Sequence, residues 1–200
     1  GGTLILSSVF LSVILWGDLE NRYLWVAFLT SMAFGVLGWI DDRLKIKHKS
    51  SDGLSPLSKI LWQSVIALLA CTYLYLSQEN IAETSLIVPF FKDISIPLGL
   101  GFIFLSYFVV IGTSNAVNLT DGLDGLAIVP VMIVAMSFAF IAYVSGNIVF
   151  SNYLLIQYIP GTGELAVFCG SLIGAALGFL WFNAPPAKVF MGDTGSLALG

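Results

Sequence analysis

The stretch Gly112–Ala127, GTSNAVNLTDGLDGLA, lies between two apolar runs, residues 103–111 and 128–141. Two asparagines and two aspartates recur within it at three-residue spacing: Asn115, Asn118, Asp121 and Asp124. On a helix or a tight helical turn, that spacing keeps the four side chains roughly on one side. Two carboxylates at the edge of an apolar segment are costly unless they meet a cation, a hydrogen-bond donor or water. The stretch is therefore either a polar loop between two membrane helices or part of a site.

The composition favours a membrane protein. Of the 200 residues, 58% are hydrophobic and only 10% are charged, whereas soluble domains carry about 25% charged residues. The mean hydropathy is +0.94. We expect an all-α fold, a polytopic membrane helix bundle with about six spans and the start of a seventh. Cys71 and Cys169 lie inside apolar runs, which predicts buried small side chains rather than a disulfide.

The apolar segments give the expected spans: residues 4–16, 23–40, 57–76, 97–111, 126–144 and 164–182, with a further one opening at Leu197. The first is short, because a span needs about 20 residues. Residues 85–99 carry Pro89 and Pro97 and are expected to form a short hairpin at the membrane interface. Gly170, Gly174 and Gly178 recur at four-residue spacing, which predicts close helix packing rather than a ligand site.

Counting spans divides the loops between the two sides of the bilayer. One side receives loops 17–22, 77–97 and 146–163, and the other receives loops 41–56, 112–126 and 183–196. Counting Lys59, the second side carries six of the Lys and Arg residues, and the first carries only Arg22 and Lys92. The positive-inside rule predicts that the second side is cytoplasmic. All the Asp-rich motifs belong to that side.

A second acidic motif, Asp41-Asp42, stands where an apolar segment ends. Adjacent residues on a helix point about 100° apart, so the two carboxylates need not face one site. One can bind or act while the other is solvated or paired with Arg43 or Lys45. A simple polar end to a membrane helix would also explain the pair. His48, the one histidine of the chain, lies in a basic segment and is expected to be solvated.

The third motif is Asn183–Ser196, NAPPAKVFMGDTGS. Its two prolines are expected to end the preceding helix. Phe190 stands among small and polar residues, where it would either stack on a base or dip into the membrane interface. The run from Gly192 to Ser196 places small residues and hydroxyls around Asp193, as in a metal or phosphate turn, although a helix N-cap would have the same composition.

Taken together, the motifs favour phosphoryl transfer at the membrane surface. Five aspartates are expected to converge there: Asp41, Asp42, Asp121, Asp124 and Asp193. They would repel one another without cations, and carboxylate oxygens suit Mg²⁺, which usually also contacts substrate phosphates. The Cys and His ligands that zinc prefers are lacking. Nearby lysines can neutralise phosphate, so the pattern indicates transfer between a soluble nucleotide and a lipid phosphate.

Three segments also carry a resemblance: GWIDD (residues 38–42), NAVNLTDGLDGLA (115–127) and NAPPAKVFMGDTGSLALG (183–200). They resemble the polyprenyl-phosphate N-acetylhexosamine-1-phosphate transferase superfamily, and the last is most similar to its peptidoglycan branch, the phospho-N-acetylmuramoyl-pentapeptide transferases. The resemblance implies a multi-pass enzyme of the bacterial inner membrane with a cytoplasmic active site, often a homodimer. It implies transfer of phospho-MurNAc-pentapeptide from UDP-MurNAc-pentapeptide to undecaprenyl phosphate with Mg²⁺, giving lipid I and UMP. No nucleic-acid partner is expected.

The resemblance also implies roles for individual residues. Asp193 would be the metal ligand, Asp41 or Asp42 the base that activates the lipid phosphate, and Asn118 and Asp121 members of the catalytic centre. The uridine pocket would be lined by five residues: Gly122, Leu123, Asp124, Asn183 and Phe190. Lys45, Lys59 and Asn115 would contact substrate.

In one respect the chain departs from this superfamily. The superfamily has a histidine-rich cytoplasmic loop further along the chain, and His48 does not match it. The sequence also starts without Met and stops at Gly200 inside an apolar run. We therefore expect residues 1–200 to be a single integral membrane domain, the middle part of a longer transferase.

The sequence is also compatible with other functions. A GlcNAc-1-phosphate transferase acting on the same lipid carrier would share all three acidic motifs. A cation-coupled membrane transporter would also need acidic residues, but near the middle of its spans rather than at their ends. A membrane scaffold without chemistry would leave the clustering of the acids unexplained.

Overall fold

The computed structural model describes residues 1–49, 53–88, 91 and 94–200. Its six longer helices are α1 (Gly2–Trp16), α2 (Arg22–His48), α3 (Pro56–Leu76), α4 (Gly101–Thr120), α5 (Ile128–Ser145) and α7 (Leu165–Asn183). Shorter elements are the helices α6 (Ile148–Leu154) and α8 (Gly192–Leu199) and the 3₁₀ turns η1 (Ile81–Thr84) and η2 (Thr162–Glu164). Among the described residues, five helices are long and apolar enough to cross a membrane, and α1 is a shorter apolar helix. The predicted all-α membrane bundle is thereby confirmed.

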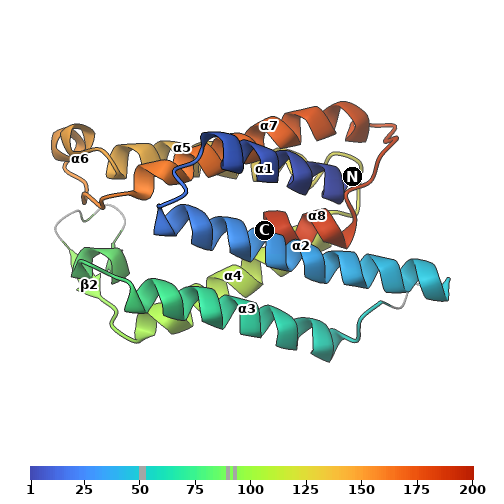
Figure 1. The fold of residues 1–200 in the computed structure, drawn as a ribbon, viewed down its shortest axis with the longest axis horizontal. Coiled ribbons are helices and arrows are strands. Elements are labelled where there is room, and N and C mark those ends of the chain that lie inside the picture. Colours follow the sequence, from blue (N-terminus) through green and yellow to red (C-terminus); the bar gives the residue numbers. More distant parts are fainter. Residues whose placement is uncertain (50–52, 89–90, 92–93) are drawn as a thin grey trace.

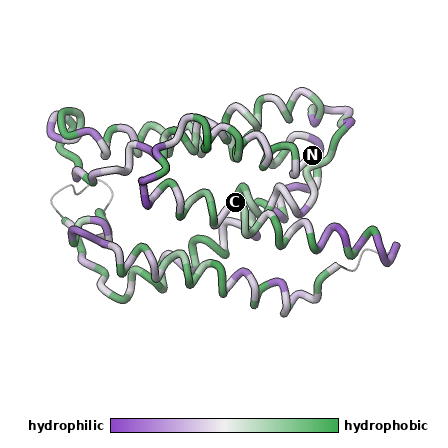
Figure 2. The backbone as a smooth tube through the Cα atoms, viewed as in Figure 1, coloured by the Kyte–Doolittle hydropathy of each residue, from purple (hydrophilic) through white to green (hydrophobic). Residues whose placement is uncertain are grey.

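The long helices lie side by side and alternate in direction (Figure 1). The connections that follow α2, α4 and α7 are at one end of the bundle, and those that follow α1, α3 and α5 are at the other. Hydrophobic residues prevail along the helices, while hydrophilic ones gather at the far end of α2 and in the connections (Figure 2). The division of the loops into two groups is as the sequence predicted. Which end faces the cytoplasm stays a prediction.

The helix ends differ from the expected span ends. α2 continues through Asp41 and Asp42 to His48, α4 continues through Asn118 to Thr120, and α8 begins at Gly192 rather than at Leu197. The predicted boundaries were wrong because apolarity marks the part of a helix that suits the bilayer, while polar residues extend the same helix beyond it. At the end of α2, basic residues in the last turn also complement the helix dipole. Asp41, Asp42, Asn118 and Asp193 therefore stand on helices, while Asp121 and Asp124 lie in the connection between α4 and α5.

The hairpin expected between the third and fourth spans is present. β1 (Ser85–Ile87) pairs antiparallel with β2 (Ser95–Pro97), with Ser85 opposite Pro97. Pro89 and Lys92 lie outside the described residues. The predicted loop 146–163 contains the unforeseen helix α6, whose first amides donate to the side chain of Asn147.

The core is formed mainly by α1, α2, α5 and α7, whose buried apolar side chains include Val9, Leu24, Phe28, Ile128 and Ala176. Cys71 and Cys169 are buried and free, as expected. The prediction for the glycine stripe of α7 was wrong. A Cβ built at Gly170, Gly174 or Gly178 would have no atom of another described segment within 4 Å, so these glycines border open space.

Helices α2 and α8 approach each other closely. A Cβ at Gly38 would collide with the backbone of Asp193, whereas a Cβ at Gly35 would collide with the Leu6 side chain of α1. Glycine at position 38 lets the backbones of α2 and α8 nearly touch. The short helix α8 is thus held against the part of α2 that leads to Asp41 and Asp42.

Candidate active site

Asp193 lies at the meeting point of four helices. It stands in the first turn of α8, and its Oδ2 is 2.7 Å from Lys59 Nζ of α3 and 3.1 Å from Lys45 Nζ of α2. Its Oδ1 accepts a hydrogen bond of 3.0 Å from Asn118 Nδ2 of α4. The Asn118 amide also donates to Ser196 Oγ at 2.8 Å. One carboxylate therefore gathers two ammonium groups and an amide from three other helices.

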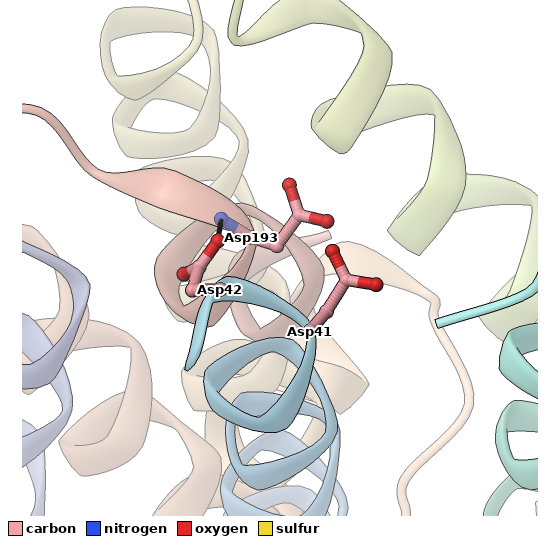
Figure 3. A group of neighbouring side chains, drawn as sticks. All are labelled: Asp41, Asp42 and Asp193. Carbon is pink, nitrogen blue, oxygen red and sulfur yellow. Dashed lines mark hydrogen bonds between the residues drawn. The ribbon is translucent and has the colours of Figure 1, made fainter. Parts of the chain in front are cut away.

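Asp41 points toward Asp193 from the end of α2 (Figure 3). It is only 2% exposed, and its Oδ1 accepts a hydrogen bond of 2.7 Å from the Leu54 amide. Its Oδ2 is buried and has no hydrogen-bond partner among the described residues, although Lys45 Nζ forms an ion pair with it at 2.6 Å. The Lys45 ammonium compensates the charge of this buried oxygen, and a divalent cation or a proton would take its place there.

Asp42 binds the first turn of α8 rather than the carboxylate of Asp193. Its Oδ1 accepts from the Asp193 amide at 3.2 Å, and its Oδ2 accepts from the Thr194 amide at 3.0 Å and from Thr194 Oγ1 at 2.7 Å. Figure 3 shows the bond to the Asp193 amide as a dashed line. The two adjacent aspartates therefore point to different targets, as the helical spacing allowed.

A cavity of about 210 Å³ opens beside Asp193. Besides Met191 and Gly192 it is lined by eight of the residues singled out in the sequence: Asn118, Asp121, Gly122, Leu123, Asp124, Asn183, Phe190 and Asp193. Phe190 is 68% exposed, so its ring is free to meet a ligand. The stretch Gly112–Ala127 and the third motif, Asn183–Ser196, thus meet around one cavity.

Hydrogen bonds between the two connections fix the walls of this cavity. Asn183 is buried, accepts from the Gly125 amide at 2.9 Å and donates to the Val189 carbonyl at 2.9 Å. Asp124 Oδ2 accepts from the Ala187 amide at 2.9 Å. Gly125 has a φ of +72°, a conformation that favours glycine. Asn183 and Asp124 line the cavity and at the same time tie its two walls together.

Asn115 is engaged elsewhere. Its Nδ2 donates to Gln63 Oε1 and to the Ile111 carbonyl, each at 2.9 Å, and Gln63 Nε2 lies 3.4 Å from Asn115 Oδ1. Gln63 is fully buried, and Asn115 is not among the residues that line the cavity. One signal could have indicated this pairing: Gln63 stands inside an apolar span, where a polar side chain needs a partner.

The electrostatics of the site are dominated by its acids. Burial, with the charges of Asp193 and Asp42, raises the pKa of Asp121 from 3.8 to about 6. Burial alone would raise the pKa of Asp193 too, but the hydrogen bonds that its carboxylate accepts from Lys59, Asn118 and Lys45 hold that pKa well below its usual range. Asp193 is therefore ionised at neutral pH, and its charge penalises ionisation of Asp121.

The residues present fit a divalent cation. Four carboxylates and two ammonium groups gather here: Asp41, Asp42, Asp121, Asp193, Lys45 and Lys59. One oxygen each from Asp41, Asp42 and Asp193 lies within 4.8 Å of the others, and Asp41 Oδ2 lacks a hydrogen bond. With the acids ionised, two negative charges are in excess. Oxygen ligands alone are the set that Mg²⁺ prefers.

The sequence model of one protein family, Glycosyl transferase family 4, matches residues 24–200. The match covers the acid pair of α2, both polar connections and α8, which together make up the site. This finding supports the superfamily of polyprenyl-phosphate sugar-1-phosphate transferases on which the sequence motifs converge. It also decides for a transferase against a transporter or a scaffold. The chain belongs to the Glycosyl transferase family 4.

Proposed function

We propose that this protein transfers phospho-MurNAc-pentapeptide from UDP-MurNAc-pentapeptide to undecaprenyl phosphate, giving lipid I and UMP for peptidoglycan synthesis. One observation carries the proposal. Asp193, flanked by Lys45 and Lys59, opens onto a cavity with an exposed aromatic side chain, at one end of a membrane bundle. A nucleotide from solution and a phosphate on a lipid would meet at such a place.

In the proposed reaction, an oxygen of the lipid phosphate attacks the phosphorus that carries the sugar. The bond from that phosphorus to the oxygen of the uridine phosphate breaks, and UMP leaves with the electron pair. Lys45 and Lys59 neutralise phosphate charge, which is the main task of a protein in phosphoryl transfer. Phe190 carries the uracil ring, and the acid pair Asp41-Asp42 supplies the base that keeps the lipid phosphate ionised.

Mg²⁺ would be held by Asp193, with help from the neighbouring acids, and when bound it would neutralise charge on the transferred phosphate. Without a cation, the lysines already contact Asp193. Binding of phosphates and a cation would therefore redistribute these ion pairs. The lysines can follow the substrate because their side chains are long and flexible.

The proposed setting is the bacterial inner membrane, with the acidic end of the bundle in the cytoplasm, where UDP-sugars are found. The larger number of Lys and Arg residues at that end supports this orientation. We further propose that the chain is the central part of a longer enzyme and that the enzyme forms a homodimer, both on the strength of the resemblance.

The proposal is tested by the sugar donor that the enzyme uses. The purified protein would be incubated with undecaprenyl phosphate, Mg²⁺ and either UDP-MurNAc-pentapeptide or UDP-GlcNAc, and the lipid extract analysed by mass spectrometry. We expect undecaprenyl diphosphate carrying MurNAc-pentapeptide. A lipid product formed only from UDP-GlcNAc would contradict the proposed donor and assign the enzyme to GlcNAc-1-phosphate transfer.

A further inference from the structure

We propose that Asp42 is a positioning residue that caps helix α8 and thereby aims Asp193, so that within the acid pair only Asp41 is left to face the reacting groups. The inference rests on the proposed function for its catalytic consequence. The capping itself is independent of that function.

The first turn of α8 needs outside partners. The first four amides of a helix have no acceptor within the helix, and a side-chain oxygen at the N-cap usually serves one of them. The N-cap residue of α8 is Met191, whose thioether is only a weak acceptor. Asp42, from another helix, accepts from the amides of Asp193 and Thr194 and from the Thr194 hydroxyl. It supplies the missing cap, and its negative charge also suits the positive end of the helix.

Glycines on both helices make room for this contact. Gly192 has a φ of +67°, and a Cβ there would lie 2.8 Å from Asp42 Oδ2. Gly38, one turn before Asp42 on α2, would collide with the Asp193 backbone if it carried a side chain. The carboxylate of Asp42 is therefore part of a tight joint between α2 and α8. The amide of Asp193 is held in that joint, which fixes the direction of the Asp193 side chain.

Asp41 and Asp42 differ in the hydrogen bonds that their carboxylate oxygens accept. Asp42 Oδ2 accepts two hydrogen bonds, which uses both lone pairs of that oxygen. Asp41 Oδ2 accepts none from the described residues and faces Lys45 and Asp193. Asp41 Oδ2 is paired with the Lys45 ammonium at 2.6 Å, but a flexible lysine can yield this oxygen to a proton or a coordinating cation. The backbone amides that bind Asp42 cannot move away in the same manner.

The test compares Asp42→Asn with Asp41→Asn, which has the same change of charge one residue away. Amide hydrogen exchange is followed in peptides covering residues 192–199, with peptides of α5 as the control for global folding. We expect Asp42→Ala, which removes both acceptor oxygens, to speed exchange in 192–199 by about 2- to 30-fold, the range that corresponds to loss of an N-cap. Asp42→Asn keeps one acceptor oxygen and should speed that exchange less. Asp41→Asn should leave that exchange unchanged.

Turnover gives the second readout. If Asp42 only positions, Asp42→Asn keeps part of the turnover and the acid limb of the pH profile, with a raised Mg²⁺ requirement, while Asp41→Asn loses turnover. Thr194→Val removes the hydroxyl that donates to Asp42 and should reproduce a milder form of the Asp42→Asn defect. Thr194→Ser keeps a hydroxyl and should retain turnover near that of the wild type.

Unchanged exchange in 192–199 in Asp42→Ala together with complete loss of turnover in Asp42→Asn would overturn the proposal, because Asp42 would then act in the chemistry. Rapid exchange in the α5 peptides as well would indicate unfolding, and the pair Thr194→Val and Thr194→Ser would then decide the role of the cap. A wild-type protein without transferase activity would refute the proposed function, while the exchange measurement would still test the cap.

Discussion

Phe190 is the residue whose role can be separated most cleanly from the others. It is exposed and lines the cavity beside Asp193. Base stacking on an aromatic ring is worth about 1–3 kcal/mol by alanine substitution. We therefore expect Phe190→Ala to weaken binding of UMP by about 5- to 150-fold.

Phe182→Ala is the matched control, because Phe182 is another exposed aromatic residue of the same region but does not line this cavity. Titration with UMP in one detergent compares the two, since UMP has no lipid tail. Equal UMP affinity in Phe190→Ala and the wild-type protein would leave Phe190 as a membrane anchor only.

Asp121 makes the stability of the metal-free protein depend on pH. Because its pKa is raised to about 6, the native state holds this proton more tightly than the unfolded state. Stability contributed by the protonated acid is present below about pH 4 and is lost as the pH rises through 6. In EDTA at pH 7.5, Asp121→Asn should therefore be more stable than the wild type, by about 1 kcal/mol after allowance for solvent screening.

Thermal unfolding in detergent at pH 4 and pH 7.5 checks this expectation. The gain in melting temperature should vanish at pH 4, where Asp121 is neutral, and it should shrink at pH 7.5 when Mg²⁺ is added. A wild-type protein that is the more stable of the two in EDTA at pH 7.5 would contradict the proposed electrostatic strain.

Much of the site could be read from the sequence at the residue scale. Asn118 and Asp121 were singled out because polar groups interrupt apolar segments, and Phe190 because it is an aromatic residue among small and polar ones. The structure places all three around one cavity. The hydrogen-bond partner of each polar side chain could not be predicted. Asp42 accepts from the amides of Asp193 and Thr194, and Asn115 bonds Gln63. Both pairings depend on which helices touch, and the spacing along the chain does not contain that information.

At the scale of elements, the pair Gln63–Asn115 joins α3 to α4 one turn away from Lys59 and Asn118, the two residues that contact Asp193 from these helices. Gln63→Leu would leave the Asn115 amide without its partner. Interhelical hydrogen bonds in membranes contribute about 0.6 kcal/mol on average and up to about 1.7 kcal/mol. We expect a lower melting temperature and a raised KM for the nucleotide donor.

A double-mutant cycle with Asn115→Leu tests whether the two amides act together. The double variant should be less destabilised than the sum of the two single variants, because neither amide is then left without a partner. Additive losses would show that the amides do not depend on each other. Ser64→Ala serves as a control, because Ser64 bonds Tyr107 across the same two helices but lies further from Asp193 along α3.

Hydropathy predicted the number and order of the long helices, but it did not predict the residues at which they end. Hydropathy reports the length of chain that suits the bilayer, whereas a helix continues as long as its backbone hydrogen bonds and caps allow. That is why α2 and α4 carry their functional residues past the apolar segments. The glycines of α7 were misleading for a related reason, since a stripe of small residues shows that helices can pack closely there and not that they do.

On the scale of the whole molecule, the end of the bundle with Asp193 must face the cytoplasm for a UDP-sugar to reach it. With Cys71 and Cys169 replaced by Ala, single cysteines can be placed at Lys47 and Asn152, which are exposed at opposite ends of the bundle. A membrane-impermeant thiol reagent applied to intact cells should label position 152 and spare position 47. Labelling of position 47 from outside would reverse the proposed orientation.

The central claim is that the enzyme moves a sugar together with its phosphate. The most direct measurement uses a UDP-MurNAc-pentapeptide donor radiolabelled in the phosphate attached to the sugar, with undecaprenyl phosphate as acceptor. We predict that the label enters the lipid extract in step with release of UMP, that EDTA stops the transfer, and that Asp193→Asn slows it by at least about 100-fold. Label that stays in the aqueous phase as UDP while the lipid gains only sugar, or full turnover in EDTA, would contradict the account.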